Sequence, residues 1–433
     1  MIIGGGWAGL SAAVTLSNNN RRCIVLESAR QAGGRARAAR FGKLHVDNGQ
    51  HLMLGAYHSM REIFGILGIP LNEAFKEKQL KLSIYHKSRH PITISATSLP
   101  APLHILQGLL KASGFSLRDK WASVRFLLHL ARNHFTLTED CSVTDYLAKH
   151  CKSHVLIENF LEPLCLAALN TPMHIASMQL FMHTLRDAFS RQRTDSNLLL
   201  PKHDLGALLP TPAMQFIESH DGQVRLGSKV RQLHITDNQI EAVVCDNEQI
   251  QADTVILATS PAASLHLLRP LNETTELYNQ IATLGSQPIC TVYLRYPEEI
   301  RLADDMIGMT GTFTQWLFDR RFCDQPGLMA AVISAEGEHM AMDKDTLTQH
   351  VLTEIAGLFP HWPAPLETMV IREKRATFSA GINIQSLRPT QKTEIGGFYL
   401  AGDYTKTPYP GTIEGAVMSG IACARTILQT ETH

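Results

Sequence analysis

Gly4-Gly5-Gly6-Trp7-Ala8-Gly9 follows directly on three apolar residues and matches the pattern G-x-G-x-x-G. In this pattern the first glycine makes a tight strand-to-helix turn, the second lets backbone approach a pyrophosphate, and the third allows close packing of helix on sheet. The helix that begins here directs unpaired N–H groups and its positive dipole end at a phosphate. The stretch predicts an α/β, Rossmann-like fold that binds a dinucleotide. Its predicted contacts are Gly4, Gly6, Trp7, Ala8 and Gly9.

The residues after the glycines complete a βαβ unit. Small and apolar residues from 10 to 16 are typical of a helix on a sheet, and 22–26 has the pattern of a buried strand. Glu27 ends that strand, about 20 residues beyond the glycines, where a carboxylate accepts from ribose hydroxyls and repels a 2′-phosphate. Only Met1, Ile2 and Ile3 precede Gly4, whereas strands usually have about five or six residues. We therefore expect the natural chain to extend a few apolar residues upstream.

Composition excludes several classes of protein. The 433 residues suit two or three domains, and Lys plus Arg equals Asp plus Glu at 40 each, so no overall field attracts nucleic acid. The eight cysteines lack a C-x-x-C pattern and are expected to be reduced core residues, and the 20 histidines lack a zinc pattern, so no metal is expected. No apolar run approaches the about 18 residues of a transmembrane helix. We expect a cytoplasmic protein with, at most, peripheral contact to the inner membrane.

Chain order predicts two interleaved domains. Signals of a nucleotide-binding domain occur in 1–60, 205–265 and 395–433, which leaves 61–204 and 266–394 for a substrate domain. The first insertion is helical in pattern from about 100 to 200, and the second alternates like an antiparallel sheet from about 275 to 390. Short strands at 224–226, 229–233 and 240–244 are expected to form a β-meander that returns to the parallel sheet at 255–257.

A second glycine motif lies near the other end of the chain. The residues 398–401 have the pattern of a buried strand, and Gly402-Asp403 follows it directly. Pro410-Gly411-Thr412-Ile413 then opens a second helix. Two helix N-termini directed at one ligand are hard to explain on structural grounds alone. We therefore expect both motifs to serve the same dinucleotide.

Three further segments carry a resemblance to a known family. They are Asp47-Asn48-Gly49-Gln50-His51, the run 162–172 from Glu162-Pro163 to Thr171-Pro172, and Pro201-Lys202-His203-Asp204-Leu205-Gly206. With the glycine motifs they make the chain similar, nearly end to end, to the flavin amine oxidase and phytoene desaturase superfamily. More narrowly, it resembles the squalene-associated FAD-dependent desaturases, or hydroxysqualene dehydroxylases. The resemblance implies a glutathione-reductase-type FAD-binding domain with an inserted α+β substrate domain, amine-oxidase-like, and non-covalent FAD.

The same resemblance assigns residues to FAD. Arg35, in the block Gly33-Gly34-Arg35, would offset the pyrophosphate charge, while Gly49 and Gln50 would run past the isoalloxazine. The backbone of Val230 would meet adenine, and Asp403 would accept from hydroxyls on the ribityl or pyrophosphate side. N–H groups at Thr412 and Ile413 would face the flavin O2 edge and stabilise negative charge on the reduced ring. The predicted cofactor contacts are Gly4, Gly6, Trp7, Ala8, Gly9, Glu27, Gly34, Arg35, Gly49, Gln50, Val230, Gly402, Asp403, Thr412 and Ile413.

Substrate and catalytic residues are predicted from the narrower motifs. Glu162 and Asn170 are expected to line the substrate pocket, although an ordinary helix end with Asn170 at a turn fits equally well. The resemblance implies that a hydroxyl is removed from the substrate, and this step needs a proton donor. We expect the donor to be Asp204 or a water held near His51 and Gln50. Asp204 also fits a helix cap. The stretch 103–111 is expected either to pack on the core or to dock on a membrane and admit a lipid.

The implied activity is removal of the hydroxyl of hydroxysqualene to give squalene, with hydride from reduced FAD, in squalene and hopanoid biosynthesis. Because no second dinucleotide motif is found, an external flavin reductant is expected. The main alternative is an oxidative carotenoid-type desaturase or isomerase acting on a C30 or C40 polyene. An amine oxidase is less favoured, since Tyr399, Tyr404 and Tyr409 form no clear paired aromatic cage. A non-catalytic lipid-handling flavoprotein is the remaining alternative.

Overall fold

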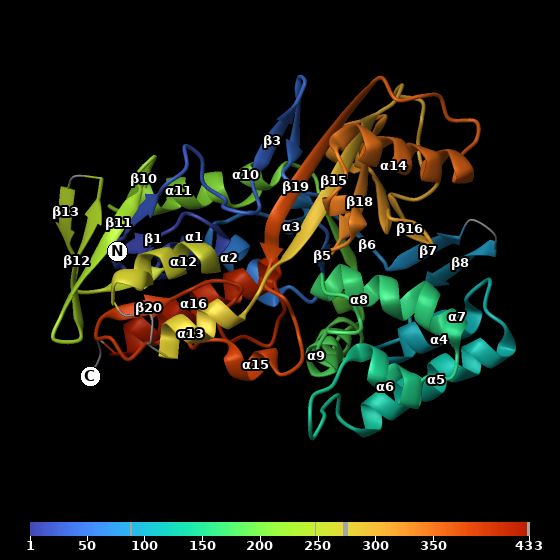
Figure 1. Ribbon diagram of the computed structural model, residues 1–433, viewed down its shortest axis with the longest axis horizontal. Coiled ribbons are helices and arrows are strands. Elements are labelled where there is room, and N and C mark those ends of the chain that lie inside the picture. The colour runs from blue at the N-terminus through green and yellow to red at the C-terminus, as the bar shows by residue number, and fades with distance from the viewer. Residues whose placement is uncertain (87–88, 247, 272–275, 431–433) are drawn as a thin grey trace.

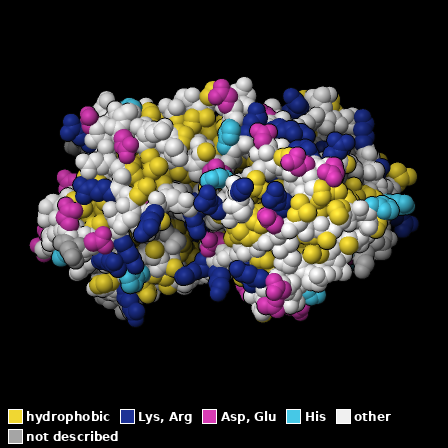
Figure 2. Space-filling model, turned by 90° about the horizontal axis from the view of Figure 1, so that it is seen from above, with side chains coloured by type: hydrophobic (Ala, Val, Ile, Leu, Met, Phe, Trp, Pro, Cys, Tyr) yellow, Lys and Arg dark blue, Asp and Glu magenta, His cyan; other side chains and the backbone are white. Residues whose placement is uncertain are grey.

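The computed structural model describes residues 1–86, 89–246, 248–271 and 276–430. Figure 1 shows a part with β1, β10, β20 and α1 at the left, a large sheet with β15, β18 and β19 at the upper right, and a group of helices at the lower right. On the face in Figure 2, acidic and basic side chains are interspersed, with Lys and Arg gathered around an indentation near the middle. This mixture is consistent with the zero formal net charge of the chain.

A five-stranded parallel sheet carries both glycine motifs. Ile2 pairs with Val25 on one side and with Ile256 on the other, so the short first strand lies at the centre of the sheet. The fold class is confirmed, and all five strands fall within the three segments predicted for the nucleotide-binding domain. In spatial order the strands are β10 (Gln223–Leu226), β2 (Ile24–Glu27), β1 (Ile2–Ile3), β14 (Val255–Leu257) and β20 (Phe398–Leu400).

Helices from distant parts of the chain cover this sheet. The first helix, α1 (Trp7–Ser17), is buried along its whole length and packs against α16 (Ile413–Thr430) and α11 (Pro210–Ser219). At their crossing a Cβ on Gly420 would overlap the carbonyl oxygen of Ala8. Gly420 of α16 therefore allows the close approach of α16 to α1. The remaining helices of this part are α2 (His58–Ile66), α3 (Leu71–Ala74), α10 (Leu205–Leu208), α12 (Pro261–Leu268), α13 (Glu276–Thr283) and α15 (Ile384–Leu387).

The predicted β-meander needs one correction. Strands β11 (Val230–Thr236), β12 (Gln239–Cys245) and β13 (Glu248–Gln251) form a three-stranded antiparallel sheet. The strand predicted at 224–226 belongs instead to the parallel sheet as β10, because its backbone continues the edge of β2 before the chain turns at Gly227 with a φ of 71°. Strand β13 was not predicted, since three of its four residues are polar and give no apolar signal.

The second insertion forms most of a seven-stranded sheet. One face packs on α14 (Lys344–Leu358) through Leu347, Val351 and Ile355, and the other faces the parallel-sheet part. The expected sheet from about 275 to 390 is present, but the first insertion adds β7 and β8, which were not predicted, and β7 pairs with β16 in parallel. The spatial order is β19 (Glu367–Thr377), β15 (Gln287–Arg295), β18 (Leu328–Ser334), β17 (Trp316–Asp319), β16 (Met306–Thr310), β7 (Lys81–His86) and β8 (Arg89–Ser95).

The first insertion is mainly helical, as expected. A capping box between Ser116 and Asp119 starts its longest helix, and a π-helical turn (Ile157–Leu161) leads into α8. No helix in the described ranges is long and apolar enough to cross a membrane. The helices are α4 (Leu103–Lys111), α5 (Leu117–Arg132), α6 (Val143–His150), α7 (His154–Leu156), α8 (Glu162–Leu169) and α9 (Met178–Phe189). Small sheets join the parts through β3 (Ala38–Phe41), β4 (Leu44–Asp47), β5 (Met53–Leu54), β6 (Phe75–Lys78) and β9 (Leu198–Pro201).

A buried carboxylate joins α16 to α2. Glu414 accepts hydrogen bonds from the backbone N–H groups of Ser59 (2.7 Å) and Met60 (3.0 Å) in the first turn of α2. Burial raises the pKa of Glu414 from 4.5 to about 7, although these N–H groups oppose the shift. The folded protein therefore retains a proton that the unfolded chain loses once the pH passes 4.5.

This raised pKa predicts a pH-dependent stability. Between pH 4.5 and about 7 the folded state binds more protons at Glu414 than the unfolded state, so the free energy of unfolding falls as pH rises. The loss should approach about 3 kcal/mol, at about 1.4 kcal/mol per pKa unit. Glu414→Gln should lack this component, and thermal unfolding of both proteins from about pH 5 to about pH 8 measures it. Parallel pH profiles would contradict the prediction.

Candidate functional site

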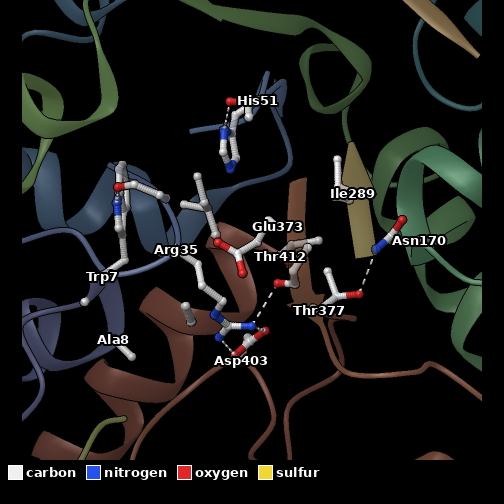
Figure 3. A pocket seen from close by; sticks show the side chains of 18 of the residues that line it. Trp7, Ala8, Arg35, His51, Asn170, Ile289, Glu373, Thr377, Asp403 and Thr412 are labelled. Carbon is white, nitrogen blue, oxygen red and sulfur yellow. Dashed lines mark hydrogen bonds and ion pairs between the residues drawn. The ribbon is translucent and has the colours of Figure 1, made fainter. Parts of the chain in front are cut away.

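A cavity of about 990 Å³ lies between the parallel-sheet part and the seven-stranded sheet. Figure 3 shows Trp7, Ala8, Arg35 and Asp403 at one side of it, with Asn170 and Ile289 at the other. Of the fifteen predicted cofactor contacts, all except Gly9 line this cavity. Residues that are as far apart in the sequence as Gly4 and Ile413 are thus brought to one surface.

Glycines at the start of α1 leave backbone open to the cavity. Gly4 has a φ of 110°, and a Cβ there would lie 2.6 Å from the carbonyl oxygen of Ala258. A Cβ on Gly34 would lie 3.2 Å from the Cα of Gly6. Gly9 lies behind the cavity wall, where a Cβ would overlap the carbonyl oxygen of Gly4, so its role is close packing. This cradle of bare backbone at a helix N-terminus fits a pyrophosphate.

Glu27 lies in the cavity wall at the end of β2. Its Oε2 accepts from the backbone N–H of Gly5 and its Oε1 from that of Ala29, each at 2.7 Å. The Ser28 hydroxyl also donates to Oε1, at 3.2 Å. These bonds fix the carboxylate beside the glycine cradle, and Oε2 keeps a lone pair for a further donor. Val230, at the start of β11, lines the same end of the cavity. The arrangement suits the ribose and base of a nucleotide.

Arg35 and Asp403 form an ion pair across the cavity wall. Arg35 Nη1 donates to Asp403 Oδ2 at 3.1 Å and to the carbonyl oxygen of Ala376 at 2.9 Å, and its Nη2 pairs with Asp403 Oδ1. Burial disfavours the charge, but the carboxylates of Asp403 and Glu373 outweigh it and raise the pKa of Arg35. From the sequence, Arg35 was predicted to contact the pyrophosphate and Asp403 to accept from hydroxyls of the cofactor. The structure instead joins them into one neutral unit that faces the cavity (Figure 3).

His51 lies in the cavity as a neutral side chain. Burial lowers its pKa, although Asp47 opposes the shift. Its Nδ1 lies 2.7 Å from the carbonyl oxygen of Gly49, which can only accept, so Nδ1 carries the proton and Nε2 keeps a free lone pair. Next to it, Gln50 Oε1 accepts from Arg320 at 2.6 Å, and Arg320 also contacts Asp47 at 3.3 Å. The buried Arg320 was not singled out from the sequence and fixes the orientation of Gln50.

Arg388 holds the loop that forms the cavity wall near the second glycine motif. It is 2% exposed, and its guanidinium donates to the carbonyl oxygens of Asp403, Thr407 and Tyr409 at 2.8 Å each, with further bonds to Tyr404 and Thr405. Burial lowers its pKa to about 10, so it remains cationic at neutral pH. Sequence reasoning missed Arg388, because nothing in its local pattern distinguishes it from a surface arginine.

A second part of the cavity is apolar. It lies between the inner face of the seven-stranded sheet and helices α8 and α9, and Leu164, Ala167 and Ala168 of α8 share one helical face toward it. This face was not predicted to line a pocket. The apolar lining residues are Leu80, Leu82, Leu164, Ala167, Ala168, Leu185, Ala188, Phe189, Leu198, Ile289, Met306, Trp316, Phe318 and Val332.

Two tyrosines in the cavity wall lie against each other. The rings of Tyr57 and Tyr409 have centroids 6.1 Å apart and are perpendicular, and the Tyr409 hydroxyl donates to the carbonyl oxygen of Ala56 at 3.1 Å. Burial raises the pKa of both phenols, so both stay protonated at neutral pH. Asp187 also lines the cavity and is bound by Arg186 at 2.9 Å and Arg191 at 3.3 Å. The perpendicular rings do not form a parallel aromatic cage.

Three predicted residues have other positions or roles than expected. Asp204 does not line the cavity, and its Oδ1 caps α10 by accepting from Ala207 N at 3.1 Å. Glu162 lies on a separate small cavity of about 260 Å³, because the first turn of α8 directs it away from the apolar face. Asn170 lines the main cavity, but its amide is engaged by Thr377 at 3.1 Å and by Ala335 at 2.8 Å. It ends α8 in the left-handed conformation, and its role in the structure is to bind the sheet to the helix.

Comparisons with known proteins show the family and the fold of the chain. The model of the family "Flavin containing amine oxidoreductase" matches residues 7–428. A hydroxysqualene dehydroxylase of Zymomonas mobilis is 27% identical over 98% of this chain and 97% of its own length. A 15-cis-phytoene desaturase of Glycine max is 24% identical over 99% of this chain and 79% of its own. The crystal structure of an oxidoreductase from Methanosarcina mazei shares the fold, with a TM-score of 0.77 at 15% identity over 99% of both chains.

Proposed function

Because the chain belongs to the family of flavin containing amine oxidoreductases and its cofactor is FAD, we propose that this oxidoreductase removes the hydroxyl of hydroxysqualene to give squalene. The single observation that carries the proposal is the apolar cavity part next to the glycine cradle. A C30 polyprenoid offers almost only hydrocarbon surface, and a wall of leucine, alanine and aromatic side chains matches it. The hydroxysqualene dehydroxylase of Zymomonas mobilis, which matches this chain nearly end to end, supports the choice.

The proposed reaction needs a proton, a hydride and a dry site. Protonation of the hydroxyl breaks the C–O bond and releases water, and a hydride then forms the new C–H bond. Reduced FAD supplies that hydride when bound and is oxidised in the process. The apolar walls around Trp316, Phe318 and Val332 exclude water that would otherwise add back to the cation.

His51 is the residue that we propose for holding a proton-donating water. Its Nε2 lone pair accepts from water while Gly49 fixes the ring, and Gln50, itself fixed by Arg320, lies beside it. A neutral imidazole is a weak acid at this position, so His51 orients the water rather than giving up its own proton. Tyr57 is a protonated donor within the same cavity and can bind the departing oxygen, whereas the Tyr409 hydroxyl already donates to Ala56. Asp204, at the cap of α10, takes no part in this proposal.

A carotenoid-type desaturase is the second candidate. Several plant 15-cis-phytoene desaturases match 99% of this chain at 24% to 26% identity, and the same apolar cavity would accept a longer polyene. That reaction runs in the opposite redox direction, for which oxidised FAD would supply the hydride acceptor. The direction of hydride transfer therefore separates the two candidates.

Anaerobic reduction of the purified holoenzyme tests the proposal. Hydroxysqualene is added to the reduced protein, return of the oxidised flavin band is followed, and the extract is analysed for squalene. We expect reoxidation with one squalene formed per flavin. A flavin that stays reduced, with unchanged substrate, would contradict the proposal, and the oxidised enzyme with phytoene would then test the desaturase. We also expect multiple turnovers to require an external reductant, supplied here by dithionite.

A further inference from the structure

Exposed hydrophobic side chains gather on the helical hairpin that α4 and α5 form. Of the eleven large hydrophobic residues exposed in the described ranges, six lie between Leu99 and Leu128. Leu117 is 76% exposed and Trp121 is 64% exposed, both on α5. Single exposed hydrophobic residues are common, but a gathered set on one element marks an interaction surface. We define the α4–α5 patch as Leu103, Leu110, Leu117, Trp121 and Leu128.

The spacing on α5 places its exposed apolar residues on one stripe. Leu117, Trp121 and Leu128 are four and seven residues apart, so they share one face of the helix. A different set, including Phe126 and Leu130, is buried against the core. Packing on the core therefore explains one face of α5 and leaves the outward stripe without a partner in the described structure. The same holds for α4, where Ile105 and Leu109 are buried and the patch residues are not.

The charge of the α4–α5 hairpin indicates which kind of surface binds the exposed apolar stripe of α5. Within 99–135 the chain carries Lys111, Arg118, Lys120, Arg125 and Arg132 against the single acid Asp119, although the whole chain has zero formal net charge. The Asp119 carboxylate is held by the hydroxyls of Ser116 and Ser153 at 2.6 Å each. Long cationic side chains that flank an apolar stripe match an anionic bilayer, where the stems lie along the apolar region and the charges reach the headgroups.

The hairpin also lies beside the apolar part of the cavity. His104 of α4 hydrogen-bonds with Ser196 at 3.1 Å, and Ser196 lines the cavity. Helix α4 packs on β8, which pairs with β7. Leu80, directly before β7, and Leu82, within it, line the cavity as well. Figure 1 shows α4 and α5 together at the lower right, below β7 and β8. One layer of structure thus separates the patch from the proposed substrate site.

We propose that the α4–α5 patch docks the protein on an anionic phospholipid bilayer. The apolar stripe enters the boundary between headgroups and acyl chains, and Arg118, Arg125 and Arg132 contact the anionic headgroups. Docking in this orientation places the apolar cavity part next to the bilayer, so a lipid substrate reaches it without crossing water. This last consequence rests on the proposed function, whereas the docking itself does not.

Vesicle flotation of the full-length holoenzyme tests the docking without substrate. We expect binding to phosphatidylcholine vesicles that contain phosphatidylglycerol, much weaker binding to phosphatidylcholine alone, and loss of the difference at about 1 M salt, where the screening length is about 3 Å. The double variant Leu117→Ser/Trp121→Ser should bind at least about tenfold more weakly. The matched control Leu366→Ser changes a residue that is 64% exposed outside the hairpin and should bind like the wild type.

Tryptophan fluorescence gives a second measurement. Trp121 is the most exposed of the four tryptophans, so its emission should shift to shorter wavelength on anionic vesicles, while Trp121→Phe should bind but lose the shift. Equal vesicle binding by the double variant and the wild type would overturn the proposal. The proposal would also be overturned if the wild type did not bind vesicles and instead formed a dimer that the double variant does not form. Turnover of detergent-solubilised hydroxysqualene should be equal in both proteins, so its absence in the wild type would count against the proposed function and not against docking.

Discussion

Arg388→Met is expected to yield protein with little or no bound FAD. The substitution removes a buried cation that five backbone carbonyl groups between Asp403 and Tyr409 share. A buried acceptor left without a donor costs about 1 to 3 kcal/mol, so we expect a loss of at least about 3 kcal/mol after partial rescue by water. The affected loop contributes Gly402, Asp403 and Thr412 to the cavity wall. FAD affinity should fall by about 100-fold or more, at about 1.4 kcal/mol per tenfold change.

Flavin content after gel filtration and the thermal midpoint measure this effect. Arg388→Lys keeps the charge but offers fewer donors in a different geometry, so its FAD affinity should lie between those of the wild type and the methionine variant. Arg295→Met is the matched control, because Arg295 forms an exposed ion pair with Glu367 at 3.4 Å on the far sheet. Such a pair contributes about 0 to 1 kcal/mol, and FAD binding should be unchanged. Normal flavin content in Arg388→Met would show that the loop keeps its shape without the guanidinium.

The contrast between Arg388 and Gly4 shows what the sequence can predict. Gly4 has a φ of 110°, and a Cβ on Gly9 would overlap the carbonyl oxygen of Gly4. Both features depend on neighbours in the sequence, and the strand-turn-helix context of these glycines was predicted correctly. Arg388 contacts carbonyl groups up to 21 positions later, and the Arg35–Asp403 ion pair joins residues 368 positions apart. Such pairs depend on how the segments pack, and one chain carries no pattern for that packing.

The two predicted site residues that do not line the main cavity, Glu162 and Asp204, also show that packing cannot be predicted from local patterns. Glu162 and Asp204 were selected because they belong to motifs, but each lies at a helix start, where the direction of the first turn decides which way a side chain points. In α8, Ala167 and Ala168 line the main cavity, whereas Glu162 lies on a separate one. Two alanines give no chemical signal in a sequence. The apolar wall of the site therefore could not be predicted from the sequence, because it depends on how α8 packs relative to the seven-stranded sheet.

Ala168→Trp is expected to abolish turnover while FAD stays bound. Ala168 lines the apolar cavity part from α8, so an indole there would occupy space that a C30 chain needs. The glycine cradle and Glu27 lie on the parallel-sheet side and contact none of the altered volume, so flavin content and its spectrum should match the wild type. We expect kcat/KM for hydroxysqualene to fall by about 100-fold or more, equivalent to about 2.7 kcal/mol of transition-state stabilisation.

Two comparisons make this result specific to cavity shape. Ala168→Ser keeps the space and should retain most of the activity, whereas a truncated tertiary or allylic prenyl alcohol should lose less activity than hydroxysqualene in the tryptophan variant. Such a difference arises only if the long chain passes the face formed by Leu164, Ala167 and Ala168. If Ala168→Trp turned over hydroxysqualene at the wild-type rate, the substrate would have to lie elsewhere. The apolar cavity part would then no longer support a polyprenoid substrate, and the proposed function would lose its main structural argument.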